Sequence, residues 1–174
     1  MMINFIFSAK EVCGYLSLIL LLSFTASPEK LHAETPENFA RQFADFKFCF
    51  HAEVQDPRIF VATKSGDCDD FATLAADTLT RSGYTPRLYA IRMKGETHVV
   101  CYIPEAKGYL DYNMRASDHP LVPCENSLQD ISNKVALSFN REWISSYEFS
   151  YREKTKWLVN NIVKNRQKNL LAIR

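Results

Sequence analysis

The sequence predicts an α+β fold in which a helix packs on an antiparallel β-meander. Two observations carry this prediction. Residues 68–82 place their apolar side chains at helical spacing, and Gly83 and Pro86 then end the helical pattern. Strand-like runs follow in close succession, at residues 87–93, 96–103 and 109–112.

The segment before this helix predicts a second, shorter helix. Thr35 and Pro36 form a typical helix start, with proline at the first helical position. The side chains that should face the core from this helix are Phe39, Phe43 and Phe46. Residues 48–54 fit either a helix end or a strand, and a short segment at 58–63 leads into the loop before Cys68.

The remainder of the chain predicts a loop, a hairpin and a helix. Residues 114–123 are expected to be loop, and residues 135–139 and 143–147 a hairpin around Asn140. The tail from about Arg152 is expected to be a basic helix with Leu158, Ile162 and Val163 on its apolar side. Such a helix either packs on the domain with a solvated basic face or contacts an anionic surface.

The first 33 residues differ in composition from the rest. An apolar run from Val12 to Ser27 follows Lys10, and the small residue Ala33 suits cleavage before Glu34. The run is short for a membrane span, so residues 1–33 are expected to be a signal peptide, with an uncleaved anchor as the alternative. The protein would then be periplasmic or secreted, and would touch the membrane only through an uncleaved N-terminal segment.

Composition places residues 34–174 in one globular domain. The whole chain has 174 residues, of which 47% are hydrophobic, and its formal net charge is +1. This charge gives no overall attraction to nucleic acid, so a nucleic-acid partner is not expected.

Cys68 is the candidate nucleophile. It lies at the start of the predicted helix 68–82, where free backbone N–H groups and the helix dipole favour a thiolate. The alternative is that Cys68 is structural. The four cysteines after residue 33 can form two disulfides in an exported protein, with three possible pairings of Cys49, Cys68, Cys101 and Cys124.

His98 and Asp111 supply the residue types that would activate this thiol. An imidazole can take the thiol proton, and a carboxylate can fix the tautomer of the imidazole. The hairpin that joins their strands has its loop centred near Ala106, so Asp111 should lie within about one diagonal neighbour of His98. The prediction requires both side chains to share one face of the sheet.

Two further groups near Cys68 have candidate roles. The Cys68 backbone N–H is one donor for an oxyanion, and Gln55 or, upstream, Gln42 is a candidate second donor. The carboxylates Asp67, Asp69 and Asp70 suit a helix N-terminus, and as adjacent oxygen donors they can also attract calcium.

The joint pattern resembles the transglutaminase-like branch of the papain-like cysteine enzymes, in particular the exported bacterial transglutaminase-like cysteine proteinases. The segments that carry this resemblance are Gly66-Asp67-Cys68-Asp69-Asp70-Phe71-Ala72, Gly83-Tyr84-Thr85-Pro86-Arg87, Thr97-His98-Val99-Val100 and Leu110-Asp111. The resemblance covers residues 55–113 and implies a papain-like core with a Cys68–His98–Asp111 triad. It also links calcium to the acidic residues beside the nucleophile, here Asp67 and Asp69.

These observations predict an exported thiol-dependent hydrolase that acts on peptide or amide bonds of a protein or peptide substrate. No cofactor is required for this chemistry, although calcium is possible. The alternatives are acyl transfer of the transglutaminase or deamidase type, a non-catalytic binding module stabilised by disulfides, and a family member with an intact triad but a blocked cleft.

Overall fold

The computed structural model describes residues 34–152 and 155–164. The predicted signal peptide or anchor, residues 1–33, lies outside them. Helices and a six-stranded antiparallel sheet make up this unit, which confirms the predicted α+β class. Within the described residues, no helix has both the length and the apolar character that crossing a bilayer would require.

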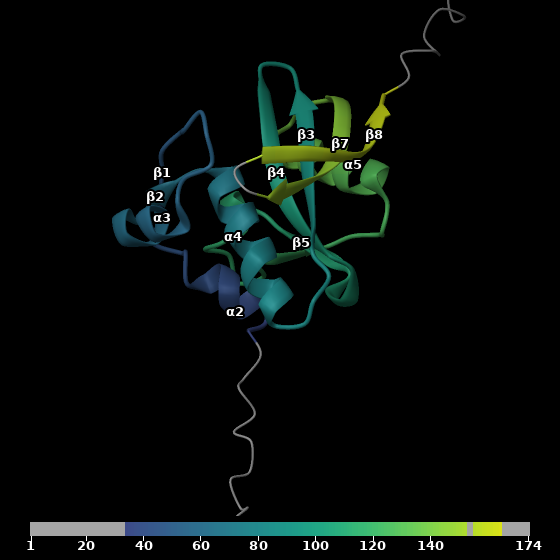
Figure 1. The fold of residues 1–174 in the computed structure, drawn as a ribbon. Coiled ribbons are helices and arrows are strands. Elements are labelled where there is room, and N and C mark those ends of the chain that lie inside the picture. Colours follow the sequence, from purple (N-terminus) through teal and green to yellow (C-terminus); the bar gives the residue numbers. More distant parts are fainter. Residues whose placement is uncertain (1–33, 153–154, 165–174) are drawn as a thin grey trace, which may run out of the picture. The chain divides into compact units, whose positions relative to one another are not determined.

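Figure 1 shows the order of elements along the chain. The helices are α2 (Pro36–Arg41), α3 (Pro57–Thr63), α4 (Cys68–Arg81) and α5 (Leu128–Ser138), with short 3₁₀ turns at Pro104–Ala106 and Tyr112–Met114. The strands are β1 (Lys47–Phe48), β2 (Ser65–Gly66), β3 (Arg87–Met93), β4 (Glu96–Ile103), β5 (Gly108–Leu110), β6 (Leu121–Pro123), β7 (Trp143–Arg152) and β8 (Thr155–Val163). The large sheet has the order β6-β5-β4-β3-β7-β8, while β1 and β2 form a separate parallel pair.

The helix that carries Cys68, α4, forms almost as predicted. Asp67 is its N-cap, and Asp67 and Asp70 together make a capping box that satisfies free N–H groups of the first turn. Gly83 follows the helix with a φ of +91°, a conformation that glycine adopts without a Cβ clash. The helix buries Phe71, Ala75 and Leu79, which confirms the predicted apolar face.

Two separate groups of buried side chains form the core. One contains Phe39, Phe43, Phe46, the apolar face of α4, and the β3 and β4 residues Leu88, Ala90, Val99, Cys101 and Ile103. The other contains residues of alternate parity in the same strands, Tyr89, Ile91, Val100 and Tyr102, with Ile131 and Val135 of α5. The large sheet is therefore covered by α4 on one face and by α5 on the other, since successive strand residues point to opposite faces.

The β4–β5 pairing decides how His98 and Asp111 lie. Ile103 pairs with Gly108, so the hairpin is centred between Glu105 and Ala106 rather than on Ala106. Because Cys101 pairs with Leu110, the next position places Asp111 opposite Val100, the diagonal neighbour of His98 on the same face. The predicted relation of His98 to Asp111 therefore holds, although β5 ends one residue before Asp111.

The predicted hairpin around Asn140 is wrong. Residues 128–138 form α5, capped by Ser127, and only the second half of the expected hairpin is a strand, in β7. Leu128, Ile131 and Val135 repeat at helical spacing and are buried, whereas Leu137 is exposed. The run from Val135 to Phe139 was too short to reveal this period by itself.

The predicted basic tail helix is also wrong. Residues 155–163 form β8, which pairs with β7 from Thr155 to Val163 with one register shift, between Glu148 and Phe149. The sequence shows a helical spacing of Leu158, Ile162 and Val163. Backbone hydrogen bonds to the partner strand β7 nevertheless favour a strand, and this pairing cannot be predicted from the spacing of nearby residues. In addition, the expected loop at 114–123 contains the short edge strand β6, which pairs with β5.

Candidate functional site

The predicted triad residues lie together in the folded protein. His98 and Asp111 are both buried, and His98 Nε2 lies 2.9 Å from Asp111 Oδ1. The thiol of Cys68 lines the same cavity as His98, and lies close enough to His98 to raise the pKa of its imidazole. Since Nε2 faces Asp111, the imidazole has Nδ1 left for the thiol. Three elements thus supply the three side chains: the start of α4, β4 and the residue that follows β5.

The surroundings hold this arrangement in place. Asp111 Oδ1 also accepts a hydrogen bond of 2.8 Å from the Asn113 backbone N–H, which fixes the carboxylate. The ring of Phe139 packs on the imidazole, with 4.8 Å between ring centroids. Such contacts keep the imidazole in one orientation between thiol and carboxylate.

The environment of His98 favours the charged imidazolium. Burial is the largest single effect and lowers the pKa of His98, but the Asp111 charge, its hydrogen bond and the Cys68 sulfur together outweigh it. Their sum raises the pKa of His98 from 6.5 to about 10. The site is therefore suited to hold a proton on His98 while Cys68 acts as nucleophile.

Cys68 and His98 open onto a cavity of about 830 Å³. Cys68 is also the first residue of α4, so its backbone N–H has no acceptor within the helix and can donate to a negative oxygen. The residues that enclose this cavity come from the 48–52 segment, the 95–99 turn and strand, Tyr112, Asn113, Phe139, Tyr147, Phe149 and Lys156.

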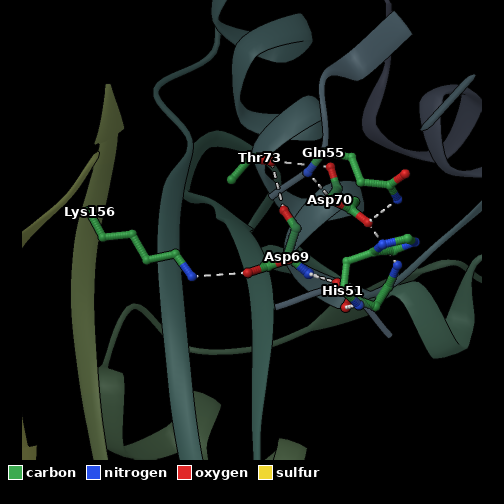
Figure 2. A network of polar contacts seen from close by, with 7 residues as sticks. His51, Gln55, Asp69, Asp70, Thr73 and Lys156 are labelled. Carbon is green, nitrogen blue, oxygen red and sulfur yellow. Dashed lines mark hydrogen bonds and ion pairs between the residues drawn. The ribbon is translucent and has the colours of Figure 1, made fainter. Parts of the chain in front are cut away.

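Gln55 has a different part from the one predicted. Its side-chain Nε2 donates to Asp70 Oδ2 at 2.7 Å (Figure 2). It also donates to the Ser65 carbonyl at 3.1 Å, so both amide hydrogens are used. It also lines another cavity, with Val54 and Pro57. Gln55 therefore holds the loop before α4 through Asp70 rather than offering a donor to an oxyanion. Gln42, the other candidate, donates to Glu34 and to the Asn38 carbonyl.

The three carboxylates beside Cys68 mainly serve the start of α4. Asp67 accepts from the backbone N–H groups of His51 and Asp69, at 2.9 and 3.2 Å. Asp70 accepts from the Asp67 N–H and from Gln55. Burial, followed by a hydrogen bond to Asp69, raises the pKa of Asp67 to about 6, although the His51 N–H opposes this rise.

This arrangement does not fit a calcium ion. Carboxylate oxygens of Asp67, Asp69 and Asp70 lie within 4.8 Å of one another. However, Asp69 Oδ1 is the one buried oxygen of these carboxylates that lacks a hydrogen-bond partner. Calcium takes six to eight oxygen ligands, and the Lys156 ammonium already lies 2.9 Å from Asp69 Oδ2 (Figure 2). The carboxylate of Asp67 caps the helix α4, and the charge of Asp69 is neutralised by Lys156.

Lys156 is a residue of the site that the sequence did not reveal. It comes from β8 and lies 87 positions from Asp69 in the chain. Its ammonium joins the C-terminal hairpin to the first turn of α4 and balances one negative charge next to Cys68. Since this position was expected in a helix, no local signal placed it near the nucleophile.

The four cysteines of the described residues are all free thiols. Cys101 belongs to the core on the α4 face of the sheet and Cys124 to the core on the α5 face, so the sheet separates them. Burial raises the pKa of the Cys101 thiol strongly and that of Cys124 to about 12, which makes both inert. Cys49 is exposed and Cys68 is partly exposed.

Compared with models of known protein families and with curated proteins, the chain matches none of them.

Proposed function

We propose that this protein is a thiol-dependent hydrolase of peptide or amide bonds, built on a papain-like core of the transglutaminase-like type. One observation carries the proposal: the His98 imidazole is hydrogen-bonded to the Asp111 carboxylate and lies beside the Cys68 thiol at the edge of a cavity. The enzyme would act in the periplasm or extracellular space if residues 1–33 are an export signal.

The reaction begins with attack by the Cys68 sulfur on an amide carbonyl. A carbon–sulfur bond forms, and the developing oxyanion accepts a hydrogen bond from the Cys68 backbone N–H. His98 then gives its proton to the leaving amine as the carbon–nitrogen bond breaks, which leaves a thioester on Cys68. Asp111 stabilises the imidazolium and holds its orientation throughout.

The second half of the reaction releases the acyl group. His98 takes a proton from water, the hydroxide attacks the thioester, and the thiol is regenerated with a carboxylic acid as product. An amine in place of this water gives transamidation, and a glutamine side chain as substrate gives deamidation. All of these reactions use the same three side chains. We propose hydrolysis because water, unlike an acceptor amine, needs no binding site of its own.

The first experiment measures iodoacetamide labelling of Cys68 against pH, read at the peptide level by mass spectrometry. The whole chain is compared with His98→Ala and with His119→Ala, which changes a histidine outside the cavity lining. Fast labelling that persists to about pH 6 in the parent and in His119→Ala, but not in His98→Ala, supports an activated thiol. Slow labelling with a midpoint near the free-thiol value of about 8.5 in all three proteins would contradict the proposal.

A further inference from the structure

The cavity in front of Cys68 is unusually rich in aromatic side chains. Six aromatic residues line it: Phe48, Phe50, Tyr112, Phe139, Tyr147 and Phe149. They come from separate parts of the chain, namely β1 and the segment after it, the turn after Asp111, the C-cap of α5 and strand β7. The rings therefore surround the nucleophile rather than belonging to one element.

Phe48 and Phe50 are the least buried of these rings, with 67% and 75% of their surface exposed. Neither belongs to the two cores, whereas Phe39, Phe43 and Phe46, just before them in the chain, are almost fully buried. Phe48 has one ring neighbour, Tyr112, at 6.5 Å between centroids. The fold thus gains little from these two side chains, and adjacent exposed aromatic surface marks a site for a ligand.

Two acidic side chains of the same cavity are held in ion pairs, one with Lys156 of the cavity and one with Arg141 outside its lining, and their unpartnered oxygens, Asp69 Oδ1 and Glu96 Oε1, are buried. Asp69 pairs with Lys156 at 2.9 Å, and Glu96 pairs with Arg141 at 3.3 Å. Asp67 accepts backbone hydrogen bonds. A charged substrate side chain would have to compete with these contacts, whereas an apolar side chain loses nothing by covering the two phenyl rings.

We propose that Phe48 and Phe50 form an apolar subsite that selects substrates with a large apolar residue within two positions of the bond attacked by Cys68. This inference rests on the proposed function, since a subsite at this place is useful only if Cys68 reacts. Burial of one large apolar side chain corresponds to a preference of about tenfold to hundredfold over glycine.

The probes are acetylated dipeptidyl chloromethyl ketones, which alkylate a thiolate with loss of chloride. Four reagents carry Phe-Gly, Gly-Phe, Gly-Gly and Gly-Asp, and their labelling rates at Cys68 are divided by that of iodoacetamide in the same protein. The variants are Phe48→Ser, Phe50→Ser and the double variant. Trp157→Ser is the matched control, because Trp157 is an aromatic residue 61% exposed on β8 that does not line this cavity.

The expected result is that one or both phenylalanyl reagents react at least tenfold faster than the Gly-Gly reagent. This preference should fall to about threefold or less in the double variant and persist in Trp157→Ser. Three outcomes would overturn the subsite: equal rates for the four reagents, a preference for the aspartyl reagent, or a preference that survives the double variant. In each of these cases, iodoacetamide labelling that depends on His98 would leave the proposed function standing. Labelling that does not depend on His98 would overturn both.

Discussion

Replacement of Asp111 by asparagine tests the triad at its most buried member. Asp111 is 2% exposed, and its oxygen lies 2.9 Å from His98 Nε2, so the substitution removes one charge and almost no volume. Without this charge, burial dominates the pKa of His98 and the imidazole becomes neutral near pH 7. Cys68 then loses the imidazolium that would stabilise its thiolate.

The size of the effect follows from the thiolate fraction. A thiol with a pKa of about 8.5 is about 0.3% thiolate at pH 6, so labelling of Cys68 should slow by up to about 300-fold at this pH. At pH 9, where a free thiol is mostly ionised, the difference should shrink to a few-fold. The assay is the rate of iodoacetamide labelling at pH 6 and pH 9, with peptide-level detection.

The matched control for this variant is Asp77→Asn, which removes an exposed carboxylate on the same helix as Cys68. Its labelling rates should equal those of the parent at both pH values. If Asp111→Asn labels within about twofold of the parent at pH 6, the carboxylate does not support the imidazolium, and the reasoning from burial and charge is refuted.

Three further predictions concern stability. Gly66→Ala should lower the free energy of unfolding by more than about 2 kcal/mol in urea titrations, because its Cβ would lie 2.5 Å from Asp70 Oδ2 and 2.6 Å from Phe60 Cδ2; an unchanged midpoint would mean that the loop gives way. Tyr112→Phe should leave the melting temperature unchanged or raise it, since the buried hydroxyl has no hydrogen-bond partner among the described residues, and a clear decrease would reveal one. Folding raises the pKa of His98 from 6.5 to about 10, so its stabilising contribution is complete below pH 6.5 and is lost as the pH rises toward 10. Urea titrations at pH 6, 8 and 10 should show this decline in the parent but a weaker one in His98→Gln, and parallel curves would contradict it.

The helix that carries Cys68 and the meander could be predicted because their signals are local. The apolar spacing of α4, its acidic cap and the Gly83 stop all lie within one stretch of sequence, as do the alternating residues of β3 and β4. The types and order of Cys68, His98 and Asp111 likewise carry chemical meaning without coordinates. In contrast, α5 and β8 could not be predicted because short apolar runs fit either period. Pairing with β7 decided the strand β8, and burial of Ile131 and Val135 in the core decided the helix α5.

By itself, the sequence determined the helix that presents Cys68 and the residue types that can activate a thiol. The tertiary structure decided which of these groups meet. The β4–β5 hairpin is centred between Glu105 and Ala106 and not on Ala106, and this shift of half a residue sets the face of the sheet on which Asp111 lies. The folded chain also brings Lys156 to Asp69, which is 87 positions away in the sequence. Gln55 lost its predicted role because both of its amide hydrogens are bound by Asp70 and Ser65. Such relations depend on strand register and hydrogen-bond competition, which are properties of the packed chain and not of any segment within it.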